Sequence, residues 1–322
     1  TNGFYIRRLK DKLGTRTLAS AELDFREAVA YPVGPVNRGF KTVVELVLNT
    51  SRLMNAVACA GAIRRAYIEA GYYACYREAF GTTIASFPMV QEAVADLMTG
   101  TYAATASSFY VAHLVDQIET GQADDAMQRN YRLLVNINKY ITSYRGSEMI
   151  HRAIEVLGGN GAIESFSILP RLYRDMVVLE SWEGTHNVLC VQVLRDIARY
   201  NVHEPFFADI IAKLDGVTAT ELTDYATITR EAVNRAMTML HRLQDGGDQY
   251  AQAHARRLVD LLSHIAQATL MLHEAQWEID NGISGFKPAV IAHYVNKRLN
   301  PSYDPLDDAD YLARLEHLMT AL

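Results

Sequence analysis

The sequence predicts a mainly α protein in which a short β segment precedes a long series of helices. β-branched and aromatic residues alternate roughly with polar ones over residues 1 to about 30, and apolar residues recur at spacings of three and four after residue 41. Glycine and proline interrupt these periodic stretches. Apolar residues fill 49% of the 322 positions, so the chain can bury a substantial core as one large domain or two modest ones.

The N-terminal segment, residues 1–40, is expected to form two or three strands. Apolar and polar residues alternate over 4–9 and again over 23–29, and Gly14 and Pro32 interrupt the pattern. The sequence opens inside a strand-like stretch and without a methionine. We therefore expect that the front of a longer protein precedes it.

Residues 41–202 are expected to form a bundle of four long antiparallel helices. Helical periodicity extends over 43–76, 88–120, 126–157 and 170–200. Gly81, Gly121 and the Gly-Gly-Asn-Gly turn at 158–161 separate these stretches. Connections this short place consecutive helices side by side and antiparallel.

Residues 203–322 are expected to form an additional helical C-terminal region. Pro205 and the pair Asp215-Gly216 break the pattern after the bundle. Amphipathic periodicity returns over 223–243, 250–281 and 307–322. The region shows no known catalytic motif, so we interpret it as an extension for packing or oligomerisation.

Composition excludes several classes of function. The formal charge of −6 provides no broad basic field for nonspecific nucleic-acid binding, although a local basic face stays open. The three cysteines lack CxxC spacing, which favours a reducing cytoplasm over a disulfide framework. The ten histidines show no metal-ligand spacing, so no metal is expected. No signal peptide and no apolar run near the roughly twenty residues of a membrane span are apparent.

One motif tells more about function than any other part of the chain. Trp182-Glu183-Gly184-Thr185 follows the turn at 158–161 by a little over twenty residues, with Arg171, Arg174 and Asp175 between them. Together these segments resemble the C-terminal signature of the flavin-dependent acyl-CoA dehydrogenases. Residues 11–25, 49–52 and 76–81 are similar to further segments of that family, in the expected order. The resemblance covers roughly the first two hundred residues, so residues 1–40 look like the end of the family's middle β domain and 41–202 like its C-terminal four-helix bundle.

The resemblance implies α,β-dehydrogenation of an acyl-CoA thioester in fatty acid metabolism, with FAD as hydride acceptor and Glu183 as the base that removes the α-proton. Trp182 would exclude water from that carboxylate, and Gly184 would let the substrate approach the backbone. Arg52 matches a family position that holds the substrate pocket and the CoA tail. Some relatives carry the base on the helix that contains Arg52, but Thr50 and Ser51 stand there, so Glu183 is the one candidate. A glutamate that caps a helix start is the alternative reading.

The same resemblance implies a cofactor site shared between subunits, so a homodimer or homotetramer is expected, together with an electron-transfer partner. The arginine at 77 would bind the pyrophosphate of a neighbouring subunit's FAD, and the two glycines of the turn would let the chain pass against it. Glu155 departs from the family, where a glutamine is common, and its charge would repel pyrophosphate unless it turns away. A solvated arginine and an ordinary helix terminator are the structural alternatives. The implied cofactor-binding residues are Arg77, Phe80, Gly81, Glu155, Gly158, Gly159, Thr185 and Asn187; Arg52 and Gly184 would bind substrate.

Two other hypotheses stay open. The Trp-Glu-Gly form and the long helical tail also resemble the alkylation-response branch of the family, whose members are flavoproteins associated with DNA binding; there the dehydrogenase activity would be weak or vestigial. A basic face would come from Arg195, Arg199, Arg230, Arg235, Arg242, Arg256 and Arg257, diluted by Asp196, Glu231 and Asp260. The third hypothesis is that this chain alone does no chemistry, because the family builds its flavin pocket partly from an N-terminal helical domain and from earlier strands of the middle domain.

Overall fold

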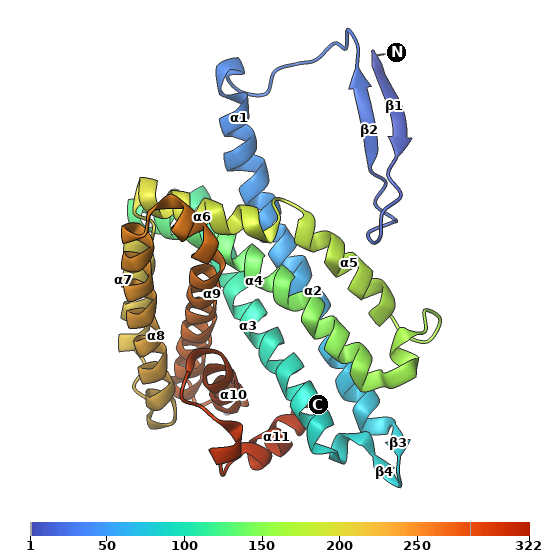
Figure 1. The fold of residues 1–322 in the computed structure, drawn as a ribbon, viewed down its shortest axis with the longest axis vertical. Helices are drawn as coiled ribbons and strands as arrows, with labels where there is room; N and C mark the ends of the chain where they lie inside the picture. The colour runs from blue at the N-terminus through green and yellow to red at the C-terminus, as the bar shows by residue number, and fades with distance from the viewer. Residues whose placement is uncertain (1, 284) are drawn as a thin grey trace.

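Helices dominate the structure, as the sequence predicts, and they form an elongated body from which a β hairpin projects (Figure 1). The structure is a computed structural model that describes residues 2–283 and 285–322. The hairpin consists of β1 (Phe4–Leu9) and β2 (Ala21–Phe25), which pair antiparallel with Phe4 opposite Phe25. Two of the two or three expected strands are therefore present.

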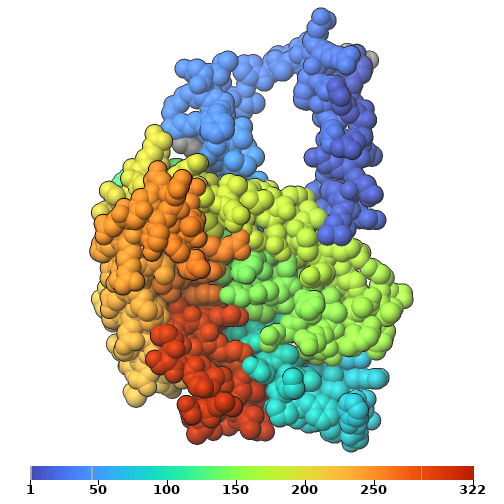
Figure 2. All heavy atoms as spheres, viewed as in Figure 1, coloured from blue at the N-terminus to red at the C-terminus, as the bar shows by residue number. Residues whose placement is uncertain are grey.

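The hairpin touches the helical body through the loop between its strands. A Cβ atom on Gly14 would lie 2.3 Å from the carbonyl oxygen of Arg174, so glycine is required for this close approach. The backbone N–H of Thr15 donates to the carboxylate of Asp175. Elsewhere the hairpin stands apart from the body (Figure 2), and the residues of β1 are exposed.

A long helical rod connects the hairpin to the bundle. It begins with the short turn η1 (Val36–Arg38) and α1 (Gly39–Thr42), continues through the π-helical turn η2 (Val43–Leu48) and ends as α2 (Asn49–Tyr76). By length and composition alone, the segment Val36–Tyr76 could cross a membrane, a test that the buried helix of a protein core also passes. Its apolar character has a structural reason over α2, where one face is buried between α3 and α4.

The bundle contains α2, α3 (Pro88–Glu119), α4 (Asp125–Leu157), α5 (Leu169–Ser181) and α6 (His186–Tyr200). The two strands β3 (Glu78–Ala79) and β4 (Thr82–Thr83) and the turn η3 (Ile84–Ser86) connect α2 to α3. The turn η4 (Gly158–Ala162) follows α4. The expected single helix over 170–200 is wrong, because Glu183 (φ 52°) and Gly184 (φ 110°) adopt left-handed backbone conformations that end α5 before α6 begins.

The C-terminal region has more helices than the sequence pattern indicated. It contains α7 (His203–Asp215), α8 (Thr220–Asp245), α9 (Gly247–Asp280), α10 (Lys287–Leu299), the turn η5 (Pro305–Asp307) and α11 (Tyr311–Met319). Pro205 lies in the first turn of α7 and Pro288 in the first turn of α10, where a missing N–H costs no helical hydrogen bond. Pro205 was therefore read as a break where it stands in the first turn of a helix.

The main hydrophobic core joins the two helical regions. One continuous cluster contains buried residues of α3, α4 and α6 together with residues from α7 to α11. A second cluster lies between α2, α3, α4 and α5. The division of the chain at residues 40 and 202 stays a prediction, but the bundle and the C-terminal region share one hydrophobic core.

Candidate active site

The turn between α5 and α6 places the predicted base, Glu183, on the surface of the bundle next to the N-terminal end of α2. Its backbone oxygen accepts a hydrogen bond from Nε of Arg52 at 3.1 Å. Its carboxylate Oε2 accepts a hydrogen bond from Nδ2 of Asn55 at 3.1 Å. The structure therefore brings together two residues that the resemblance implicated, Glu183 and Arg52, which lie 131 positions apart.

Arg52 is almost fully buried and bridges three elements. Besides Glu183, its guanidinium donates to Oδ1 of Asn136 on α4 at 2.8 Å and to Oε1 of Gln192 on α6 at 3.1 Å. Burial lowers the pKa of Arg52, and the carboxylates of Asp196 and Glu183 oppose this shift. Its contacts hold the backbone of the turn, and the substrate role that the resemblance implies stays a prediction.

A second buried cation, Lys139 on α4, donates hydrogen bonds to the backbone on both sides of Glu183. Its side chain is fully buried, and Nζ donates to the backbone oxygens of Glu180 at 2.9 Å and Gly184 at 3.0 Å. The Glu180 carbonyl lies in the last turn of α5, where a cation is favoured electrostatically, and the Gly184 carbonyl belongs to the turn that follows. Burial lowers the pKa of Lys139 to about 8, while Cys59 and Glu183 oppose the shift.

Sequence reasoning missed Lys139 and Asn55. Lys139 lies within the apolar run Leu133–Ile141, and a single charge in such a run is the signal that could have identified it. Asn55 lies one turn after Arg52 on α2 and donates to the backbone oxygen of Leu179 at 3.0 Å as well as to the Glu183 carboxylate. Asn55 has no comparable signal, because the two oxygens to which it donates are more than 120 positions away.

Three further residues lie close to Glu183 in the sequence: Trp182, Thr185 and Asn187. Trp182 is half-buried, with Nζ of Lys12 from the hairpin loop 5.9 Å from its ring centroid. Thr185 is exposed and precedes α6 without a side-chain capping bond. Asn187 is also exposed and accepts a hydrogen bond from Arg256 on α9 at 3.0 Å. The base, the hairpin loop and the C-terminal region therefore meet at one place.

The remaining predicted cofactor residues lie at the opposite end of α2. Arg77, Phe80 and Gly81 follow α2 in the β3–β4 hairpin, at the lower end of the bundle in Figure 1. The side chain of Phe80 is 96% exposed, and no heavy atom lies within 4 Å of a Cβ built on Gly81. At a rise of about 1.5 Å per residue, Arg77 lies roughly 37 Å from Arg52 along the helix axis.

The glycine turn after α4 lies near this second group. Gly158 has φ 59°, and Cβ atoms built on Gly158 or Gly159 would meet nothing within 4 Å. Nδ2 of Asn160 donates to the hydroxyl of Tyr73 on α2 at 3.0 Å, which fixes the turn beside the end of that helix. Because both glycines face open space, another chain or a ligand can approach the backbone here.

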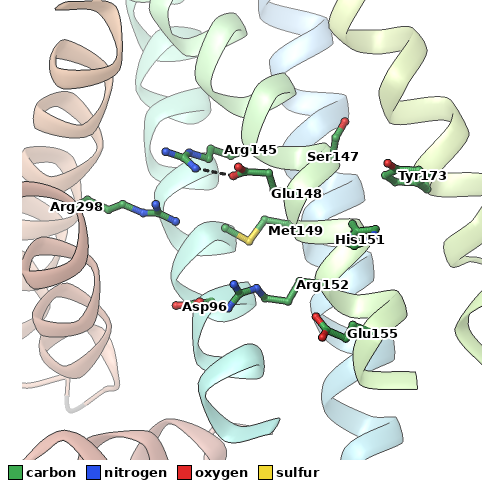
Figure 3. Close-up of a pocket in the computed structure, with 10 residues that line it drawn as sticks. All are labelled: Asp96, Arg145, Ser147, Glu148, Met149, His151, Arg152, Glu155, Tyr173 and Arg298. Carbon is green, nitrogen blue, oxygen red and sulfur yellow. Dashed lines mark hydrogen bonds and ion pairs between the residues drawn. The ribbon is translucent and has the colours of Figure 1, made fainter. Parts of the chain in front are cut away.

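Glu155 lies one turn before these glycines and lines a cavity of about 580 Å³ (Figure 3). The arginines of this cavity are mostly matched by carboxylates. Arg145 pairs with Glu148 at 2.6 Å, and Arg152 pairs with Asp96. Within the part of the chain that the structure describes, no group of three or more His, Cys, Asp or Glu side chains is placed to hold a metal ion.

Comparison with known proteins assigns the bundle, including the turn at Glu183, to a protein family. A family model described as the acyl-CoA dehydrogenase C-terminal domain matches residues 37–198, which include α2 to α6 and the Glu183 turn. The chain belongs to the acyl-CoA dehydrogenase family. The C-terminal region from α7 onward lies outside that match.

Individual acyl-CoA dehydrogenase relatives extend this result. Acyl-CoA dehydrogenase family member 11 of Caenorhabditis elegans is 31% identical over 87% of this chain and 45% of its own length. The putative acyl-CoA dehydrogenase AidB of Escherichia coli is 34% identical over 60% of this chain and 35% of its own. The chain thus spans less than half the length of these relatives.

Solved structures of acyl-CoA dehydrogenases share the fold across most of this chain. The structure of Caenorhabditis elegans ACDH-11 in complex with C11-CoA superposes with a TM-score of 0.86 at 27% identity, covering 94% of this chain and 51% of that one. An acyl-CoA dehydrogenase complexed with FAD from Bacillus anthracis gives a TM-score of 0.80 at 18% identity, covering 99% of this chain and 60% of that one. At that identity the second likeness concerns the fold alone.

Proposed function

We propose that this chain contributes the catalytic half of an FAD-dependent acyl-CoA dehydrogenase, with Glu183 as the base. The observation that supports this most is the fixed turn: Arg52 and Lys139 hold its backbone, and Asn55 holds one carboxylate oxygen of Glu183. A surface glutamate that merely capped a helix would not need two buried cations beneath it. The C11-CoA bound to the related ACDH-11 supports an acyl-CoA thioester as the substrate class.

The residues of this chain have separate tasks in the proposed reaction. The Asn55 amide donates to Oε2 of Glu183, and Oε1, which accepts no hydrogen bond from the described residues, would take the α-proton of the thioester. Arg52 and Lys139 hold the backbone of the left-handed turn, so the Glu183 carboxylate is oriented before the substrate binds. FAD, when bound, supplies the acceptor for the β-hydride.

The residues of the second group fit a cofactor shared between two copies of the chain. The Gly158 and Gly159 backbone is open, and the arginine at 77 can offer a bidentate contact to pyrophosphate. Glu155 is exposed, so its carboxylate can turn to water instead of facing phosphate. Because about 37 Å separates the two groups along α2, one cofactor can contact both only if two chains supply them. We therefore propose a homodimer or a homotetramer.

The compartment and the redox partner are part of the same proposal. Cys59, Cys75 and Cys190 are free thiols, which supports a reducing cytoplasm. The electrons that the cofactor receives must leave it before the next turnover, so we propose an electron-transfer protein as partner.

A Glu183→Gln variant tests the role of the base. The variant keeps the shape and the hydrogen bond from Asn55 but cannot accept a proton. We expect the flavin-loaded protein to retain its cofactor and yet to lose bleaching of the flavin absorbance when an acyl-CoA is added, by about 100-fold or more in rate. Glu164→Gln, in the exposed loop before α5, is the control. Normal bleaching in Glu183→Gln would remove Glu183 from the mechanism.

Duplex DNA binding is the second candidate function, and the arrangement of arginines gives it limited support. Arg235, Arg242 and Arg257 line one cleft between α8 and α9, whereas Arg230 is paired with Asp215 at 2.8 Å. Binding to duplex DNA that weakens as salt rises would favour this candidate. Lack of binding at low salt would rule out duplex DNA binding as a function of this chain.

A further inference from the structure

The cleft between α8 and α9 differs in charge from the rest of the molecule. It has a volume of about 620 Å³ and is lined by three arginines, Arg235, Arg242 and Arg257, and by no carboxylate. The whole chain carries a formal charge of −6, so this cleft is positively charged in a protein whose net charge is negative. The cavity of Figure 3 shows the opposite arrangement, because three carboxylates accompany its three arginines.

Among the residues that the structure describes, no carboxylate forms an ion pair with any of these three arginines. Arg235 donates to the backbone oxygen of Leu299, and Nη1 of Arg257 contacts Nδ1 of His254 at 2.9 Å. Both acceptors are neutral when the histidine is deprotonated. The Arg242 side chain makes no hydrogen bond or ion pair within the described residues. Three guanidinium groups around one concavity repel one another, and a bound anion would relieve that repulsion.

The ring of Tyr250 also lines this cleft, and the turn between α8 and α9 fixes its position. Tyr250 and His254 lie one turn apart on α9, with ring centroids 4.4 Å apart at an angle of 66°. A Cβ atom on Gly246 would lie 2.2 Å from Cδ1 of Tyr250, so a side chain there would displace the ring. Gly247 (φ 76°) then reverses the chain. The glycine pair thus lets the tyrosine ring lie close against the turn, next to the arginines.

We propose that this cleft binds the phosphate group of a small aromatic phosphate ester, such as a nucleoside monophosphate. Arg242 and Arg257 would contact the phosphate oxygens, and Tyr250 would stack on the ring. Thr238 and Asn234, also in the lining, supply neutral hydrogen-bonding groups. A concave cleft of this size favours a small molecule over a rigid nucleic-acid duplex. The inference is independent of the proposed dehydrogenase reaction, because the cleft lies in the region outside the family match.

Calorimetric titration with three probes tests the proposal: adenosine monophosphate, inorganic pyrophosphate and a short DNA duplex. We expect both small probes to bind, with affinity falling as salt rises. Arg242→Gln and Arg257→Gln should each weaken both by about tenfold or more, as expected for loss of a charge-assisted hydrogen bond. Tyr250→Ala should weaken adenosine monophosphate but leave pyrophosphate unchanged.

Arg230→Gln is the matched control, because Arg230 lies on the same helix but is paired with Asp215 and does not line the cleft. It should bind all probes as the unaltered protein does. No binding of either small probe, or equal binding by Arg242→Gln, would overturn the proposal. A duplex that binds more tightly than adenosine monophosphate and depends on Arg242 would assign the surface to nucleic acid instead. Flavin content should be unchanged in every variant, which separates this test from that of the proposed reaction.

Discussion

At the residue scale, two buried cations make the Glu183 turn rigid. Arg52 and Lys139 both donate to backbone oxygens, and within the described residues neither forms an ion pair with a carboxylate. Burying a charge in this way is costly, and it is tolerated only where the charge is fully hydrogen-bonded. The resemblance pointed to Glu183 and Arg52. It did not point to Lys139 or Asn55, because the oxygens to which they donate lie more than 40 positions away in the sequence.

Replacing Lys139 with methionine tests whether the lysine positions the base. The variant leaves the backbone oxygens of Glu180 and Gly184 without their donor, so the turn should loosen. We expect flavin reduction by an acyl-CoA to slow by about 10- to 100-fold, since small misplacements of a reacting group have effects of this size. Amide hydrogen exchange at residues 183–185 should be faster.

Lys139→Arg is the companion variant, because it keeps a cation that can donate to both oxygens. It should recover part of the protection against exchange. If exchange in the turn were the same in Lys139→Met as in the unaltered protein, the lysine would have no positioning role.

His186, the first residue of α6, predicts a stability change in acid. Its ring packs edge-on against Tyr140 and Tyr144, and burial lowers its pKa to about 4. The unfolded chain then binds a proton between about pH 6.5 and 4 that the folded protein excludes, so stability falls as pH falls through this window. The shift corresponds to at most about 3 kcal/mol.

The His186→Phe variant isolates this contribution, since phenylalanine can keep the packing and cannot titrate. The melting temperature should fall less between pH 7 and pH 4 in the variant than in the unaltered protein. His264 is buried and its pKa is also lowered, so some acid sensitivity should remain. Parallel melting curves for the two proteins would contradict the assignment.

At the element scale, periodicity predicted the long helices well and their interruptions poorly. The predicted ranges 88–120 and 126–157 agree with α3 and α4 within one residue at each end. The break at Glu183-Gly184 was missed because the apolar pattern continues in phase across it. The helix α7 was missed because Pro205 was taken as a break, although it stands in the first turn of that helix, and no amphipathic stretch was assigned over α10.

The contact of the hairpin loop with α5 predicts the effect of one small substitution. In Gly14→Ala the new methyl group would overlap the backbone of Arg174, so the loop must leave α5. We expect limited proteolysis to remove residues 1–40 faster in this variant, while the far-ultraviolet circular dichroism of the helices is unchanged. Gly39→Ala is the matched control, because a Cβ there meets nothing within 4 Å. Equal cleavage rates in both variants would mean that the loop does not hold the hairpin.

At the scale of the whole molecule, the shared core predicts that the bundle and the C-terminal region unfold together. Phe206 on α7 is fully buried in the cluster that also contains residues of α3, α4 and α6. Phe206→Ala should lower the free energy of unfolding by about 3–5 kcal/mol. Urea unfolding followed by fluorescence and by circular dichroism should give one coincident transition for both proteins. Two separated transitions would instead show that residues 203–322 fold as an independent unit.

The position of Trp182 has a practical consequence. The chain contains two tryptophans: Trp277 is 59% exposed, whereas Trp182 is half-buried beside the base and beneath the ammonium of Lys12. Their emission should therefore differ in colour, with the bluer component arising next to Glu183. The protein thus carries its own optical reporter at that turn, and ligand arrival or release of the hairpin can be followed without a dye.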